Sequence, residues 1–542
     1  MTRTSRVLLA VWCVVVTCVV FWPFAATLVR ATVGIFSGSS GDALLLRDMS
    51  VPPTMALNDL ATGQDGLPRA MPQDAVLAVL SPLIPPPVVV SIIMLACGVL
   101  GTCGAAILAH RFSSPTCSFV PFLAAGLTLW NPFVAERLLQ GHWSVVAAGV
   151  LLPTIALVVG RGSGRSVLLV IPLLLVCALT PTGLILATVT ALVACLMRPR
   201  GQRGVRAAAL AVTAVVLSLP WAVTTLLNAG ATATLSDAAG ADMFAARAEP
   251  WVGTLGALAG LGGVWNAEAV PASREWLAPV STLAGVLLAL TAVVVAVLLA
   301  RRGRLQGTPL VVLALVAVVV PAVMATSPGL AITGWAIENV PGAGLVRDAQ
   351  KFVVLALPGL IVLLAQVPVL VGRLTDRTWV PQVSVLSLLV LVWAGVPALP
   401  RDVSEVTPVA MDDRYSTVVD QVDQWAEAPG NDDHPRTLLW PPGNYRMVAD
   451  RPVLDPLLKM LPGSPVDPGY LIVDGELVDG DADTVRLLGD LASGEDSLAE
   501  NDIDLVVVQD GGPEAATDTA LEVLDRHELL WADDGWSIYT VQ

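Results

Sequence analysis

The long apolar segments of this chain constrain its fold more than any other feature. About 20 consecutive apolar residues cross the hydrocarbon core of a bilayer as a helix, and such segments recur from the N-terminus to residue 400. With 55% hydrophobic residues and a mean hydropathy of +0.73, the chain has the composition of a polytopic membrane protein. We predict eleven spans, near residues 7–29, 86–109, 117–131, 143–160, 166–180, 183–197, 207–228, 279–300, 309–326, 352–371 and 383–399.

The charges of the connecting loops predict an orientation. Arginine-rich loops, for example at 198–206 and 301–304, alternate along the chain with acidic or neutral ones. Because short basic loops stay in the cytoplasm, we expect the N-terminus inside and the C-terminus outside. The first span lacks a small-residue cleavage site and is followed by further spans, so we expect it to remain in place. A strong bias to Ala, Val, Leu, Gly and Arg over Lys, Asn and Ile suggests a GC-rich bacterial genome. We therefore expect a multi-pass protein of a bacterial plasma membrane.

The last part of the chain has a different composition. Residues 401–542 hold 8 Lys and Arg against 31 Asp and Glu, whereas residues 1–400 hold 22 against 14. This change divides the chain into a membrane domain, 1–400, and an acidic extracytoplasmic domain, 401–542, which would repel nucleic acid. The fold class we predict is mainly α, a polytopic helical membrane protein with a small extracytoplasmic α/β domain. In that domain we expect strands at 437–440, 503–508 and 536–541 and helices at 483–492 and 521–529.

Residues 130–153 place Glu136, Arg137 and His142 between two apolar runs. Asn131-Pro132 ends the preceding helix, because proline lacks an N–H group and disfavours helical geometry in the residue before it. We predict that 132–140 form a short amphipathic helix in the membrane interface, with Glu136 and Arg137 facing water. A charged pair at the edge of a bilayer is costly and therefore indicates a functional site. The structural alternatives are a salt bridge that joins two helices and, for His142, an interfacial anchor.

Ionisable residues are nearly absent from the centres of the predicted spans and concentrate in the outer loops. A proton- or ion-coupled transporter usually carries them inside the membrane, so this distribution favours an active site at the outer face. In the first outer loop, Asp42 or Asp48 is the candidate general base, or a metal ligand with the other. The alternative for Asp42 is to cap a short helix that begins near it. Glu136 is the third candidate acid.

Basic residues in the outer loops are candidates for binding a lipid phosphate. Arg347 and Lys351 are four residues apart, which would place them on one helix face at the mouth of the tenth span. Arginine can bind phosphate through two hydrogen bonds, and lysine acts as a point charge. The alternative is a pair of anchors whose side chains reach the headgroups. Arg47, Arg137 and His142 complete the candidate substrate-binding set.

These features together resemble the integral-membrane GT-C-type glycosyltransferases related to actinobacterial cell-envelope arabinofuranosyl- and mannosyltransferases and to YfhO-like membrane proteins. The resemblance lies in the first span with its long acid-bearing outer loop, the RLLQGHW run after Glu136, the VRDAQKF run that contains Arg347 and Lys351, and the small C-terminal domain. It implies transfer of a sugar from a polyprenyl-phosphate donor to an envelope glycan or lipid acceptor, among membrane lipids at the outer face. The family's essential acid lies in the first outer loop and matches Asp42 or Asp48.

The family often has a paired acid or a metal-binding DxD motif in that loop, whereas here the two acids stand six residues apart. The sequence therefore leaves open whether the protein binds a divalent metal, and no other cofactor is implied. Two other functions also stay open at this point. One is a non-catalytic envelope-assembly factor, and the other is a lipid or glycolipid transporter.

Overall fold

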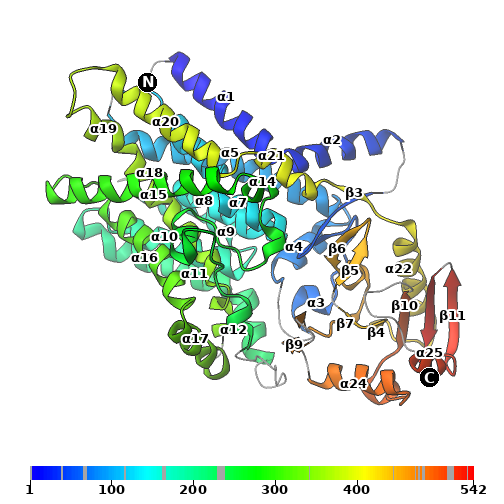
Figure 1. The fold of residues 1–542 in the computed structure, drawn as a ribbon. Coiled ribbons are helices and arrows are strands. Elements are labelled where there is room, and N and C mark those ends of the chain that lie inside the picture. Colours follow the sequence, from blue (N-terminus) through cyan, green and yellow to red (C-terminus); the bar gives the residue numbers. More distant parts are fainter. Residues whose placement is uncertain are drawn as a thin grey trace.

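A bundle of apolar helices forms most of the molecule, and a smaller α/β unit adjoins one side of it (Figure 1). The computed structural model describes residues 3–37, 41–64, 70–114, 117–160, 166–228, 239–340, 342–443, 445–469, 471–473, 476–478, 482–509, 518–533 and 535–541. The bundle helices are α1 (Arg3–Val20), α2 (Trp22–Ser37), α5 (Pro86–Phe112), α6 (Val120–Leu129), α7 (Pro132–Gln140), α8 (Trp143–Gly160), α9 (Ser166–Cys177), α10 (Pro181–Cys195), α11 (Arg200–Asn228), α15 (Ala278–Arg301), α16 (Thr308–Met324), α17 (Ser327–Asn339), α18 (Leu357–Ala365), α19 (Val367–Val371) and α20 (Trp379–Gly395).

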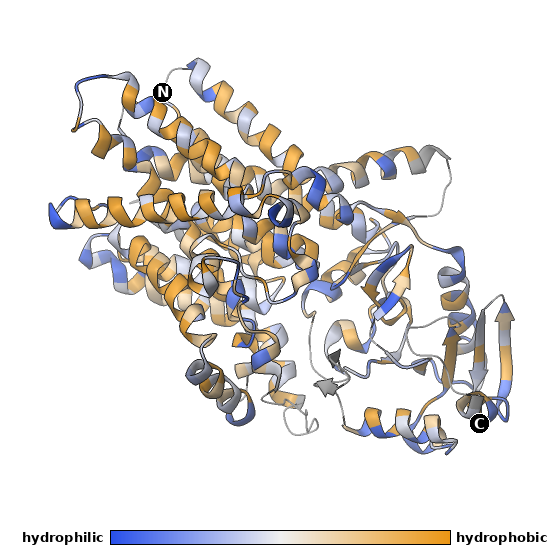
Figure 2. Ribbon diagram, viewed as in Figure 1, coloured by the Kyte–Doolittle hydropathy of each residue, from blue (hydrophilic) through white to orange (hydrophobic). Residues whose placement is uncertain are grey.

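Short elements lie in the connections between these helices. They are α3 (Asp59–Thr62), α4 (Gln73–Leu80), α12 (Ala239–Met243), α13 (Gly253–Ala259), α14 (Ala272–Trp276) and the 3-10 helices η1 (Ala267–Ala269), η2 (Ala343–Val346) and η3 (Ala349–Ala356). Apolar residues dominate the bundle helices, whereas polar and apolar residues alternate more often in the α/β unit (Figure 2).

Within the described residues, seven helical segments are long and apolar enough to cross a membrane. They are Arg3–Val20, Pro86–Phe112, Trp143–Gly160, Arg200–Leu227, Ala278–Arg301, Ala349–Val371 and Trp379–Val406. An eighth crossing is possible if α16 and α17, which meet at an 88° bend, act as one broken span. The predicted count of eleven is therefore not confirmed, because the segment at 117–131 gives only the ten-residue α6 and those at 166–180 and 183–197 give short helices.

Two helix boundaries follow from proline. The predicted first span, 7–29, is interrupted at Phe21, and α2 starts at Trp22 with Pro23 in its first turn. Proline has no N–H to continue the hydrogen bonds of α1, so the chain begins a new helix there. The predicted break between the segments at 166–180 and 183–197 is confirmed, since α9 ends at Cys177 and α10 begins at Pro181, where proline is tolerated as a first helical residue.

The residues after 398 build a five-stranded sheet of order β11-β12-β10-β4-β7, in which β4 runs parallel to β7 and β10. Side chains alternate between its faces: Leu439 and Val507 pack with α22, and Leu438 and Val506 pack with α24 and α25. The elements are α21 (Leu399–Asp402), η4 (Val403–Val406), β3 (Val409–Ala410), α22 (Asp413–Ala426), β4 (Arg436–Trp440), β5 (Tyr445–Val448), β6 (Arg451–Leu454), α23 (Leu457–Met460), β7 (Ser464–Val466), β8 (Leu471–Val473), β9 (Glu476–Val478), α24 (Ala482–Ser493), η5 (Ala499–Asn501), β10 (Leu505–Gln509), α25 (Asp518–Leu524), β11 (Glu528–Asp533) and β12 (Trp536–Thr540).

The sequence predicted this α/β arrangement in outline, with one error. The helix expected over 521–529 ends at Leu524, and Glu528 already begins β11. Pairing of β11 with β12 explains the difference, because cross-strand contacts override the local helical spacing of the leucines.

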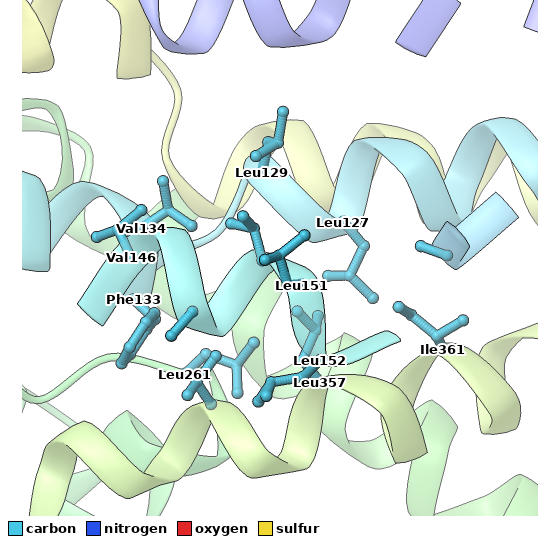
Figure 3. Close-up of a cluster of buried hydrophobic side chains, with 14 of the residues drawn as sticks. Leu127, Leu129, Phe133, Val134, Val146, Leu151, Leu152, Leu261, Leu357 and Ile361 are labelled. Atoms are coloured by element: carbon cyan, nitrogen blue, oxygen red, sulfur yellow. The ribbon is translucent and has the colours of Figure 1, made fainter. Parts of the chain in front are cut away.

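The first outer loop joins the α/β unit through β1 (Asp42–Leu46) and β2 (Met49–Val51). Strand β1 pairs with both β2 and β3, and its residues Ala43 and Leu45 are buried against the α/β unit. Strand β1 also replaces the short helix considered near Asp42, so Asp42 is not a helix cap. On the bundle side, α7 and α8 form a closely packed core with Leu261 and α18 (Figure 3).

Candidate functional site

Helix α7 carries the charged residues singled out in the sequence, and its bounds match the prediction. Asn131 caps it by accepting a hydrogen bond from the Val134 N–H at 3.1 Å, and Pro132 is its first residue. All nine residues are buried, and Glu136 and Arg137 are 0% exposed. The prediction that both charges face water is therefore wrong. The helix instead contacts α8, η1, η3 and η4, which cover it.

The β1–β2 turn packs onto the end of α7. Gly141 follows the helix with φ +95°, and a Cβ atom there would lie 2.2 Å from the Met49 nitrogen. The turn consists of Arg47 and Asp48. The Asp48 N–H donates to the Gln140 carbonyl at 3.1 Å, and Arg47 Nη1 donates to the Leu139 carbonyl at 2.6 Å. These bonds satisfy carbonyls that the helix end leaves free, and they fix Asp48 beside α7.

The carboxylate of Asp48 accepts hydrogen bonds from three side chains. Tyr445 donates its hydroxyl to Oδ1, while Gln140 Nε2 and His142 Nε2 both lie 2.9 Å from Oδ2. Burial raises the pKa of Asp48, but the hydrogen bonds from His142, Tyr445 and Gln140 outweigh it and hold the pKa below its ordinary value. The side chain keeps 26% of its surface exposed, so an ionised carboxylate is presented to water.

Arg137 forms the buried end of the same network. Its Nη1 and Nη2 donate to the two oxygens of Asp348 at 2.5 and 2.8 Å, and Nη2 also donates to Gln350 Oε1. Burial raises the pKa of Asp348, but the Arg137 guanidinium lowers it to about 2 overall. A paired, two-point contact of this kind is strong and directional.

His142 connects Arg137 to Asp48. Its Nδ1 lies 3.1 Å from Arg137 Nη1. Because a guanidinium can only donate, Nδ1 must accept, which leaves the proton on Nε2. His142 therefore donates from Nε2 to Asp48 Oδ2, and the contacts run continuously from Asp348 through Arg137 and His142 to Asp48.

Glu136 belongs to a second network, although it adjoins Arg137 in the sequence. Arg274 on α14 donates to Glu136 Oε1 at 2.8 Å and to Glu249 Oε2 at 2.8 Å. The Val264 N–H donates to Glu136 Oε2 at 3.0 Å. Burial raises the pKa of Glu136 to about 7, against the opposing effect of Arg274.

Gln350 links the two networks. It accepts from Arg137 and donates through Nε2 to the Gly262 carbonyl at 3.1 Å and, more weakly, to Glu136 Oε2 at 3.4 Å. Because every polar group of its amide has a partner, Gln350 fixes the distance between the two networks.

Lys351 and Arg347 lie beside the first network but not on one α-helical face. Lys351 is in the 3-10 helix η3, and Arg347 precedes it at a bend, so the four-residue spacing does not align them. Both side chains are half-buried. Lys351 interacts electrostatically with Asp348 and Arg137, and the Arg347 guanidinium lies 4.3 Å from the centroid of the Phe244 ring.

Two other candidates have different surroundings. Asp42 starts β1 and lies 3.5 Å from Arg30, with which it forms an ion pair. Arg47 donates hydrogen bonds to the carbonyls of Leu139 and Glu268, and its side chain is only 10% exposed. Asp48 is thus the acid of the first loop that is connected, through His142, to Arg137.

The residues that surround Asp48 do not fit a divalent metal. Both of its oxygens already accept hydrogen bonds, and Asp42, the second acid of that loop, pairs with Arg30. Among the described residues, no group of three or more His, Cys, Asp or Glu side chains is placed to hold a metal ion. Such ions need several oxygen or nitrogen ligands pointing to one position.

Several members of the two networks had not been selected from the sequence. Asp348 counts among the ionisable outer-loop residues of the VRDAQKF run but received no role, and Gln350 in the same run was missed. Glu249, Arg274 and Tyr445 come from segments to which no chemistry was assigned. The usable signal was an ionisable residue next to apolar or aromatic residues, as in the SREW segment that contains Arg274. Their partners could not be derived, because they lie up to 397 residues away in the chain.

The fold and the site define a polytopic helical membrane protein with a buried charge network where its bundle meets a small α/β unit. Its structure is similar to that of the arabinofuranosyltransferase AftD from Mycobacteria, solved by single-particle cryo-electron microscopy in a mutant form. The TM-score is 0.52 at 15% sequence identity, and the match covers 100% of this chain and 42% of that enzyme. The likeness supports the expected GT-C-like fold and shows the fold alone. No protein-family model matches the sequence, and no curated protein matches it either.

Proposed function

We propose that this protein is a membrane glycosyltransferase whose general base is Asp48. The observation that carries the proposal is the exposed end of the first network, where an ionised carboxylate with 26% of its surface accessible contacts His142, which links it to Arg137. Lys351 interacts electrostatically with Asp348 and Arg137 in the same network. The GT-C-like fold supports the same class. Asp42 is the weaker candidate, because its contacts are with Arg30 rather than with this cluster.

In the proposed reaction, Asp48 takes the proton of an acceptor hydroxyl while that oxygen bonds to the anomeric carbon of the donor sugar. The bond between that carbon and the phosphate oxygen breaks, and the leaving phosphate keeps the electron pair. A base with a lowered pKa is already deprotonated at neutral pH, and hydrogen-bond geometry then decides its efficiency. Lys351 and Arg347 are the proposed partners of the lipid phosphate, since both remain half-buried rather than enclosed.

We further propose a polyprenyl-phosphate-linked sugar as donor, an envelope glycan or lipid as acceptor, and an extracytoplasmic location for the α/β unit of a bacterial plasma-membrane protein. Alternation of basic and acidic loops supports this orientation. Arg137, with 0% exposure and four hydrogen-bonded contacts, is proposed to position His142 and Asp348 rather than to touch substrate.

The test is lipid and glycan profiling of a deletion strain complemented with wild type, Asp48→Asn or Asp42→Asn. Loss of the base predicts a fall in product of about 100-fold or more for Asp48→Asn, whereas Asp42→Asn should retain most of the product. Both variants must reach the membrane in normal amounts. An envelope-assembly factor would tolerate both changes, and that outcome would overturn the proposal.

A further inference from the structure

A cavity of about 50 Å³ adjoins the second network at Glu249 and Arg274. It lies among α13, α15, α18, α20 and the junction of α6 with α7, and most of its wall is apolar, for example Gly285, Leu360 and Val392. Because a water needs roughly 10–15 Å³ of such space, the cavity accommodates a group of only a few non-hydrogen atoms. Anything larger must extend beyond it.

Three polar residues of the cavity wall each carry a buried atom without a hydrogen-bond partner in the part of the chain that the structure describes. They are Glu249 Oε1, Arg274 Nε and Ser281 Oγ. The side chains of Arg274 and Glu249 are only 7% and 9% exposed. Buried polar groups are nearly always hydrogen-bonded, so unsatisfied atoms on three residues that line one cavity indicate a polar occupant.

The chemistry of these atoms selects the occupant. Glu249 Oε1 requires a donor, Arg274 Nε–H requires an acceptor, and Ser281 can serve as either. A hydroxyl group both donates and accepts. A fully ionised phosphate or carboxylate has no donor for Glu249, and an anion would lie beside two acids, Glu136 and Glu249, that share a single guanidinium. An ammonium ion cannot accept from Arg274.

The apolar wall of the cavity indicates which kind of molecule carries the hydroxyl group. The helices α15 and α20 and the segment containing α18 are among the candidate membrane-crossing segments, and α15 exposes Leu283 and Leu287 next to the cavity. We infer that this cavity binds the hydroxyl end of an uncharged, membrane-resident lipid alcohol. This site is separate from the Asp48 network and does not depend on glycosyl transfer.

The test is photolabelling of the full-length purified protein in lipid nanodiscs with a diazirine-bearing hexadecanol, followed by peptide mapping. We expect saturable labelling of the peptides that contain Glu249 and Ser281, displaced by unlabelled hexadecanol but not by hexadecyl phosphate. Ser281→Ala should weaken labelling about fivefold, the effect of removing one hydrogen bond. A Cβ atom at Gly285 meets only Gly260 Cα, at 3.9 Å, so Gly285→Leu can fill the cavity and should abolish labelling.

The matched control is Ala300→Leu, an exposed position on the same helix that does not line the cavity, and it should label as wild type does. Thermal unfolding of each variant verifies that the fold is retained. Equal displacement by hexadecyl phosphate would show that the site is not selective for an alcohol. Unchanged labelling in both Ser281→Ala and Gly285→Leu would show that the lipid alcohol binds outside the cavity. Either result overturns the inference.

Discussion

Glu136 and Arg137 are neighbours on α7, yet they belong to networks of different character. The Arg137 network leads through His142 to Asp48, and these last two side chains are 25% and 26% exposed. The Glu136 network stays buried with Arg274 and Glu249 and borders an apolar cavity. Because consecutive residues of a helix point about 100° apart, one short helix can supply both.

The difference shows that burial of charge does not by itself identify a reactive site. Both networks contain buried ion pairs, but of the two only the Arg137 network ends in a carboxylate that water and a dissolved hydroxyl can reach. The Glu136 network ends in buried polar atoms without a hydrogen-bond partner among the described residues, and water or the polar group of a lipid can supply that partner. The first arrangement suits proton transfer, and the second suits binding of an uncharged group.

The largest effect on stability should come from breaking the buried pair of the Arg137 network. Arg137→Met leaves Asp348 buried without a counter-charge and should lower the free energy of unfolding by about 3–5 kcal/mol. Adding Asp348→Leu removes that uncompensated charge and should restore much of the loss. Denaturant titration in mixed micelles measures both variants. Equal destabilisation of the single and double variants would show that packing, not charge, is responsible.

The next effect tests the contact that holds Asp48 at the end of α7. Gly141→Ala combines a left-handed backbone with a 2.2 Å approach to the Met49 nitrogen, so it should cost about 2–4 kcal/mol and displace Asp48. Gly430→Ala is the matched control, since Gly430 has φ +98° but open space around its Cβ position. It should cost about 1 kcal/mol and leave product formation unchanged. If the two variants lose the same stability and form the same amount of product, close packing of the β1–β2 turn against Gly141 does not position Asp48.

A smaller, pH-dependent effect separates the networks. The folded-state pKa of Glu136, about 7, exceeds its ordinary 4.5, so the folded protein holds an extra proton between these values. Stability should therefore fall as pH rises from 4.5 to 7 and then level off, and Glu136→Gln should remove that fall. Asp348, with a pKa of about 2, loses its contribution only as pH falls through that value, so it does not affect this window. Unfolding midpoints measured across the window for both proteins provide the check.

The smallest effect concerns an ion pair outside both networks. His434 lies 3.0 Å from Asp59, which raises its pKa, and its side chain is 53% exposed. The pair should contribute stability that is fully present below the ordinary pKa of 6.5 and is lost as pH rises through the folded pKa. Because exposed pairs contribute at most about 1 kcal/mol, His434→Gln should change the midpoint slightly at low pH only. A shift as large as that of Arg137→Met would contradict this ranking.

The sequence alone determined the features that depend on near neighbours. Asn131, Pro132 and Gly141 set the ends of α7 through capping and backbone preference, and apolar length marked the main bundle helices. The strands β4 and β12 were likewise found from their β-branched and apolar residues. These signals act within a few residues, so they can be read without knowing the fold.

Tertiary structure alone decided whether α7 faces water and which partners its charges take. Glu136 pairs with a residue 138 positions away, and Arg137 with one 211 positions away. The local pattern was compatible with an interfacial helix, but η1, η3, η4 and the β1–β2 turn cover it. Long-range packing decides which of many charged residues become ion-pair partners, and a short stretch of sequence does not contain that information. For the same reason, only the tertiary structure shows that Asp48, and not Asp42, joins the Arg137 network.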